Sequence, residues 1–194
     1  MPRLFTALEV PSVIGERLSF LRGGLPGARW IDAENYHVTL RFLGDVDERT
    51  ASEAADLLVG VKRDPVQVSI TELGVFGGDR PRSIIARVQP NTELTELQAE
   101  HERLMRRAGL APEGRKFTPH VTLARLRDVS AHAVADWLSL RGGGPALDYE
   151  ADRFVLLSSR ASTGGGPYMV EEAYPLGFGV DDEEGETEDD ETLW

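Results

Sequence analysis

The chain has 194 residues, contains no cysteine and carries a formal net charge of −12. Without cysteine it has no disulfide, no thiolate nucleophile and no cysteine-ligated zinc site. Nine acidic residues and no base lie between Asp181 and Trp194, so residues 1–180 carry a net charge of only −3. Such a nearly neutral body argues against a protein that wraps long nucleic acid, but it is compatible with one that grips a single phosphate in a pocket.

The ends of the chain suggest where the protein works and which part of it folds. No apolar run approaches the ~20 residues that span a bilayer, and the first five residues lack the form of a secretory signal. We therefore expect a cytoplasmic protein that acts as a monomer, with no membrane and no obligate protein partner. Residues 181–191 have no apolar content to bury, so we expect a folded domain at 1–180 and a flexible acidic tail at 181–194.

Strand and helix patterns alternate along the expected domain. Strands are expected at residues 3–10, 36–43, 66–73, 83–88, 120–126, 149–158 and 168–178. Helices are expected at residues 11–23, 47–60, 92–108 and 130–140. Hairpin-type connections at 77–81 and 164–167 favour antiparallel pairing, and therefore an α+β fold over a doubly wound parallel sheet.

The chain contains an internal repeat. Residues 37–46 and 120–129 are identical at seven of ten positions, at an offset of 83. Each copy is followed by a capping residue and a helix, with Asp47 after the first copy and Ser130 after the second. The repeated strand–turn–helix unit predicts two half-domains related by an approximate twofold, with the two motifs facing each other across a cleft.

Each copy of the repeat begins with a His-x-Thr sequence. Because side chains alternate along a strand, His37 and Thr39 share one face, and His120 and Thr122 do the same. One neutral imidazole could take a proton from water while the other, as imidazolium, protonates a leaving alkoxide. The hydroxyls could stabilise phosphate oxygens, and no metal is needed in principle. A zinc site is the rival interpretation, but no third ligand lies at a suitable spacing.

The remaining candidates are weaker. His101 and His132 fall on or beside helical faces and are interpreted as structural or solvent-facing. Arg41 has the strand parity of the first motif and could point into the cleft. Arg125 has the opposite parity to the second motif and would need a bulge or the strand's end to reach it. Either arginine could instead be a solvated surface charge.

At these motifs the chain resembles the two-histidine (2H) phosphoesterase superfamily. More closely, it is similar to the bacterial and archaeal RNA 2′,3′-cyclic phosphodiesterases, long named 2′-5′ RNA ligases (LigT/ThpR-like). The resemblance covers nearly all of residues 1–178. The segments that carry it are residues 3–8, 35–44, 117–125 and 157–159, together with Tyr168.

The resemblance implies a bilobal α+β fold in which two antiparallel sheets surround a central cleft, with helices outside. It implies a reaction that opens a 2′,3′-cyclic phosphate to a 2′-phosphate without a cofactor. His37 would donate a proton to the 3′ oxygen, and His120 would activate water. Thr39 and Thr122 would hold the phosphate, and Arg125 matches the family's arginine after the second motif. The expected partner is an RNA 3′ end or a small nucleotide with a 2′,3′-cyclic phosphate.

Two alternatives stay open. One is a different activity on the same fold, either reversible 2′-5′ RNA ligation or cleavage of a small cyclic nucleotide or 2′-5′ oligonucleotide. The other is a non-catalytic module that binds RNA ends or nucleotides. The presence of both motif histidines argues against the second.

Overall fold

The computed structural model describes residues 3–159 and 166–177. The strands are β1 (Arg3–Glu9), β2 (Ala28–Trp30), β3 (His37–Asp45), β4 (Val66–Phe76), β5 (Ser83–Val88), β6 (His120–Leu126), β7 (Leu147–Ala151), β8 (Arg153–Ser159) and β9 (Tyr168–Pro175). The helices are α1 (Ser12–Ser19), α2 (Glu48–Leu58), α3 (Thr92–Arg107) and α4 (Ala131–Ser139), with a 3-10 turn at Ala33–Asn35. The acidic tail and half of the expected turn at 164–167 lie outside the described residues.

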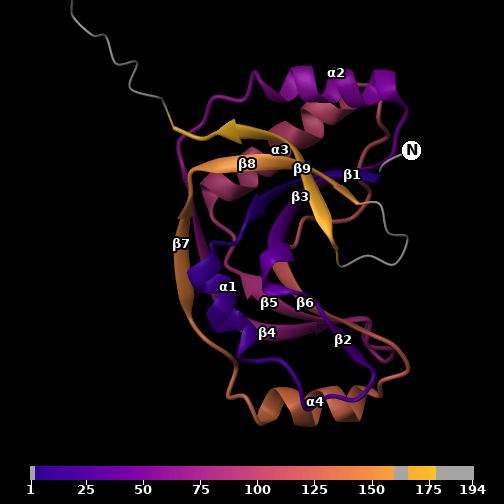
Figure 1. Cartoon of the computed structure of the whole chain (residues 1–194), viewed down its shortest axis with the longest axis vertical. Coiled ribbons are helices and arrows are strands. Elements are labelled where there is room, and N and C mark those ends of the chain that lie inside the picture. Colours follow the sequence, from indigo (N-terminus) through magenta and orange to yellow (C-terminus); the bar gives the residue numbers. More distant parts are fainter. Residues whose placement is uncertain (1–2, 160–165, 178–194) are drawn as a thin grey trace, which may run out of the picture.

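The strands form one antiparallel sheet in the order β7-β4-β5-β6-β3-β1-β8-β9, with β2 added against β6 (Figure 1). The order reads as two four-stranded halves that meet at β3 and β6. Those two central strands are paired only through Val38 and Val121. The predicted α+β class and pseudo-twofold arrangement are therefore confirmed, and the two expected sheets are halves of one continuous ladder.

The helices lie outside the sheet halves. In Figure 1, α2 and α3 lie at one end of the molecule and α4 at the other. The predicted caps of α2 and α4 are confirmed, because Asp47 accepts a hydrogen bond from the Thr50 amide at 2.8 Å and Ser130 accepts one from the Ala133 amide at 3.1 Å. A side-chain acceptor at this position satisfies an amide that the first helical turn leaves unpaired.

The core lies on the face of the central strands opposite the polar motif positions. Val38 and Leu40 on β3, and Val121 and Leu123 on β6, are all buried in the main apolar cluster. This burial anchors the two motifs, since a slip of one residue would carry the apolar set to the other face.

Three elements differ from the sequence prediction. The segment expected as one strand at 149–158 is two strands, β7 and β8, which pair with β4 and β1 respectively. The chain therefore crosses from one half of the sheet to the other at Asp152. The short strand β2 was not predicted, because three residues are too few to show a period. Helix α1 ends at Ser19, four residues before the expected Gly23.

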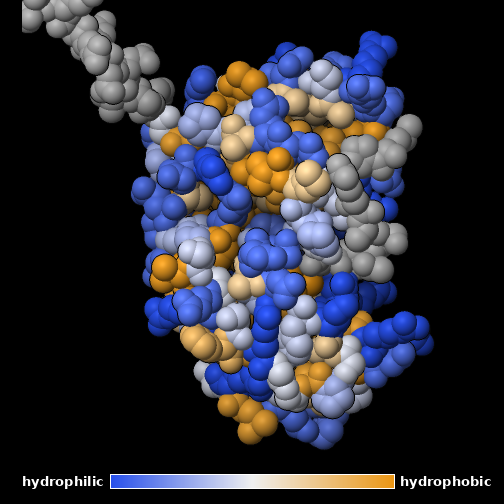
Figure 2. All heavy atoms as spheres, in the orientation of Figure 1, coloured by the Kyte–Doolittle hydropathy of each residue, from blue (hydrophilic) through white to orange (hydrophobic). Residues whose placement is uncertain are grey.

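The outer surface is mixed in character. On the face shown in Figure 2, hydrophilic residues predominate and the hydrophobic ones form separate groups. Among residues 3–159 and 166–177, no helix has the length and apolarity needed to cross a bilayer.

Candidate active site

The two His-x-Thr motifs lie side by side at the centre of the sheet. The pairing of Val38 with Val121 sets the register of β3 against β6. His37, Thr39, His120 and Thr122 flank this pair and are half-buried, whereas the paired valines are fully buried. Because side chains alternate along each strand, the two imidazoles and two hydroxyls share the face opposite the core.

Both imidazoles are held by the same kind of hydrogen bond. Nδ1 of His37 lies 2.8 Å from the carbonyl oxygen of Asn35, and Nδ1 of His120 lies 2.7 Å from that of Thr118. A carbonyl oxygen can only accept, so each Nδ1 must carry hydrogen and donate. In a neutral ring Nε2 then holds the lone pair. Each histidine therefore has one oriented nitrogen left for proton transfer.

Aromatic rings enclose the two histidines to different degrees. The His37 ring has its centroid 5.0 Å from that of Phe5 and 5.1 Å from that of Tyr168, with the Tyr168 ring perpendicular. The His120 ring meets one aromatic residue, Phe76, whose centroid is 4.7 Å away and whose ring is also perpendicular. The two motifs thus share the same hydrogen bond from imidazole to backbone carbonyl, but the aromatic contacts around the two histidines differ.

This enclosure changes the protonation of both rings. Burial lowers the pKa of His37 to about 4, and mutual repulsion with His120 and Arg125 contributes to the same direction. Burial also lowers the pKa of His120, with repulsion from Arg125 and Arg87 adding to it. Both rings are therefore neutral at pH 7. Arg125 places positive charge near both of them.

A β-bulge follows each motif at equivalent positions. Leu40 is the extra residue of β3 against β1, and Leu123 is the extra residue of β6 against β5. The bulge shifts the alternation by one residue, since two residues of the bulged strand oppose one of its partner. Consequently Phe42 and Arg125, which occupy equivalent positions of the repeat, are exposed and line the same cavity. Arg125 needed a bulge in its strand to reach the side of the second motif, and this bulge is present.

The same bulge removes the parity argument for Arg41. Its side chain is only 6% exposed, and its guanidinium donates to Glu102 of α3 and to the carbonyl oxygens of Phe42 and Ala111. Arg41 lines part of the cavity wall. However, its donors are engaged by protein groups, whereas no carboxylate among residues 3–159 and 166–177 pairs with Arg125.

The cavity beside the motifs has a volume of about 480 Å³. Thr39 and His120 line it, together with Arg125, and so do three cations that the sequence pattern did not predict, Arg82, Arg115 and Lys116. Arg82 comes from the loop between β4 and β5, and the other two come from the loop between α3 and β6. A single sequence gives no sign that they face the same space.

A model of one protein family, the LigT-like phosphoesterases, matches the chain twice, at residues 8–86 and 87–168. The chain belongs to this family. Each of the two consecutive matches contains one copy of the repeat, residues 37–46 in the first and 120–129 in the second. Together they cover well over half of its length.

Individual members of the LigT-like phosphoesterase family agree with this assignment. An RNA 2′,3′-cyclic phosphodiesterase of Thermotoga maritima is 31% identical over 179 residues, which are 87% of this chain and 92% of that one. One of Aeropyrum pernix is 36% identical over 113 residues, or 57% of this chain and 64% of the relative. The crystal structure of Escherichia coli LigT with 3′-AMP superposes with a TM-score of 0.73 at 25% identity, covering 91% of this chain and 99% of that one.

The other two histidines lie outside the motif face of this LigT-like phosphoesterase. His101 is completely buried, shares a 2.8 Å hydrogen bond with Thr6 and packs against Phe154 at 4.5 Å between ring centroids. Burial lowers its pKa to about 3. His132 is exposed on α4 and lies 3.3 Å from Asp136 one turn later. Within the described residues no three His, Asp or Glu side chains are grouped around a common metal position.

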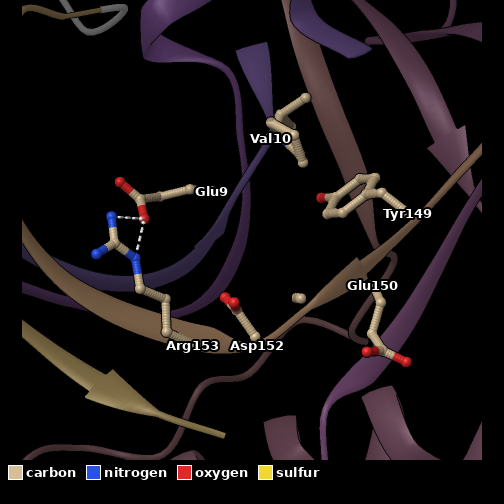
Figure 3. Close-up of a pocket in the computed structure, with 8 residues that line it drawn as sticks. Glu9, Val10, Tyr149, Glu150, Asp152 and Arg153 are labelled. Atoms are coloured by element: carbon tan, nitrogen blue, oxygen red, sulfur yellow. Dashed lines mark hydrogen bonds and ion pairs between the residues drawn. The ribbon is translucent and has the colours of Figure 1, made fainter. Parts of the chain in front are cut away.

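A second, smaller cavity of about 240 Å³ lies at the crossing between the halves (Figure 3). An ion pair between Glu9 and Arg153, at 2.7 Å, forms one side of it. Tyr149 lines it too, and its buried hydroxyl has no hydrogen-bond partner among the described residues. None of the six predicted site residues lines this cavity.

Proposed function

We propose that this LigT-like phosphoesterase hydrolyses the 2′,3′-cyclic phosphate at the end of an RNA to a 2′-phosphate. The observation that carries the proposal is the pair of His-x-Thr motifs on one sheet face, each with an oriented imidazole, next to a cationic cavity that Thr39 and His120 line. The names of the relatives support the same substrate. We further propose that the protein is a cytoplasmic monomer.

In the proposed reaction water attacks the phosphorus and the bond from phosphorus to the 3′ oxygen breaks. Nε2 of His120 takes a proton from the water, and Nε2 of His37 gives a proton to the departing 3′ alkoxide. The products are a 2′-phosphate and a 3′ hydroxyl, and one water is consumed. The two imidazoles exchange protonation states and return to the starting state through solvent.

The remaining site residues stabilise charge on the phosphate. The hydroxyls of Thr39 and Thr122 lie on the face of the imidazoles and can donate to the non-bridging oxygens. Arg125 brings a guanidinium to the same cavity, where it can pair with those oxygens in a charge-assisted hydrogen bond. Donors fixed on a sheet need little reorganisation as charge develops.

The substrate itself must charge the proton donor. Burial holds the pKa of His37 at about 4, so its imidazolium form is scarce at neutral pH. A bound phosphodiester places a negative charge between the rings and favours their protonated forms. Donor function by His37 is thus coupled to substrate binding.

The test is turnover of an oligoribonucleotide that ends in a 2′,3′-cyclic phosphate, in EDTA, with the product identified by mass and phosphatase mapping. The parent is compared with His37→Ala, His120→Ala and the control His132→Ala, because His132 is exposed on α4. We expect a 2′-phosphate from the parent and the control. Losing either motif histidine should cost about 10²- to 10⁴-fold in rate.

Several outcomes would oppose the proposal. No turnover by the parent would leave a nucleotide-binding module as the better interpretation. Formation of a 2′-5′ linkage in place of hydrolysis would favour ligation. Loss of activity in EDTA with rescue by zinc would overturn the two-histidine mechanism.

A further inference from the structure

The wall of the catalytic cavity carries more positive charge than one cyclic phosphate needs. Five cations line it, at positions 41, 82, 115, 116 and 125, against one carboxylate, Glu113. The chain as a whole is strongly negative, with a net charge of −12. A local concentration of cations on such a protein attracts anions to that place and repels them elsewhere.

Two of the five cations are neutralised by the protein. Arg41 is buried against Glu102. Arg115 makes a two-pronged pair with Glu113, at 3.1 and 3.2 Å. Neither has charge to spare for a ligand.

The other three cations face the cavity without a carboxylate. No acidic side chain of the described residues lies within ion-pair distance of Arg82, Lys116 or Arg125, and all three are exposed. The cavity therefore presents three uncompensated positive charges. A terminal cyclic phosphodiester carries one negative charge, and of these three cations Arg125 is the one whose charge acts on both histidines.

The segments that carry the two remaining cations, Arg82 and Lys116, are connected to the second motif through the backbone. The carbonyl oxygen of Arg82 accepts from the amide of Leu126 on β6 at 2.8 Å, so the β4–β5 hairpin is tied to the strand that carries His120. Lys116 lies two residues before Thr118, whose carbonyl oxygen orients His120. The backbone at both positions is thus held close to the second motif, and the exposed side chains extend from it.

We propose that Arg82 and Lys116 bind the phosphodiester groups that precede the terminal nucleotide, so that this site prefers an RNA strand over a cyclic mononucleotide. Each phosphate of a strand adds one negative charge, which matches the surplus on the cavity wall. The inference rests on the proposed function. It assigns to Arg82 and Lys116 the preference of the enzyme for a longer substrate.

The test compares kcat/KM for a 2′,3′-cyclic mononucleotide with that for a trinucleotide ending in the same cyclic phosphate. Arg82→Gln and Lys116→Gln are measured beside matched controls, Arg80→Gln on the same hairpin and Lys62→Gln, the only other lysine in the chain. Neither control lines the cavity. Salt dependence is recorded for each, because a lost phosphate contact lowers the slope of log affinity against log salt by about 0.7 for a single strand.

We expect the parent to favour the trinucleotide by about 10-fold or more, since charge-assisted contacts to phosphate are strong. Each cavity variant should reduce this preference and the salt slope, while both controls retain them. Equal use of the two substrates by the parent would overturn the inference and leave the proposed function standing. A preference that survives in both cavity variants, or falls equally in the controls, would also overturn it. Turnover of neither substrate would refute the proposed function itself.

Discussion

The depressed pKa values of the motif histidines predict an unusually acidic optimum for kcat/KM. This parameter reports the ionisation of the free enzyme. In the reactive form one of the two motif histidines is protonated and the other is neutral. The population of this form is greatest at the pH midway between the two pKa values of the pair. The pKa of His37 is about 4 and that of His120 lies below 6.5, so the maximum falls below about pH 5.3.

The two motif histidines set both the rise and the fall of kcat/KM with pH. As pH falls from 7, kcat/KM rises because the singly protonated pair becomes populated. It falls again once pH drops through about 4, because both rings are then protonated. The maximum of kcat should lie at higher pH, since it reports the bound state and the bound phosphodiester stabilises imidazolium.

A substitution beside His37 tests the physical cause. The Tyr168 ring covers one side of the His37 imidazole, with 5.1 Å between the ring centroids, and Tyr168→Ala exposes that side to water. Each unit by which rehydration raises the pKa of His37 should move the kcat/KM maximum up by about half a unit, because the maximum is a mean of two values. The assay is a pH–rate profile on a cyclic mononucleotide, with NMR titration of the imidazoles and a check of folding at each pH. A parent maximum above pH 6.5 would refute the reasoning.

Four further predictions concern stability and charge. His101 has a pKa of about 3 when folded and 6.5 when unfolded, so its contribution to the free energy of unfolding should fall by about 1.4 kcal/mol per unit as pH drops from 6.5 towards 3. In urea titrations His101→Leu should show a slope smaller by that amount, with the part due to the motif histidines remaining; an unchanged slope would exclude a contribution from His101. Arg125→Gln should lower kcat/KM by 10-fold or more, and raise the pH of its maximum because a repelling charge is gone; an unmoved maximum would separate Arg125 from the histidines. Arg41→Met should destabilise the fold by about 3 kcal/mol, since it strands the Glu102 carboxylate, and a loss below 1 kcal/mol in urea would contradict that account. Removal of residues 181–194 should leave kcat unchanged, and a large fall would reveal a role for the tail.

Local rules were enough for the parts of this protein that depend on neighbours in sequence. The strand β6 and the caps of α2 and α4 follow from alternation and from side-chain acceptors at helix starts. The repeat predicted two equivalent units that bring their motifs together, and the structure places the motifs side by side on paired strands rather than on opposite walls of a cleft. His37 and His120 could therefore be chosen as candidates before their surroundings were known.

Tertiary structure decided what lies around those histidines. Strand parity favoured Arg41 as a cleft residue and disfavoured Arg125. A bulge in each central strand instead exposes Arg125 in the cavity, while Arg41 lies in the cavity wall with its donors engaged by protein groups. The crossing at Asp152 exists because β7 and β8 pair with different halves of the sheet. Arg82 and Lys116 reach the cavity from separate loops. Each of these features depends on a partner distant in sequence, so the pattern of apolar and polar residues within one segment cannot predict it. The alternation of side chains is a property of one strand, whereas a bulge, a crossing or a shared cavity is a property of the strands and loops it meets.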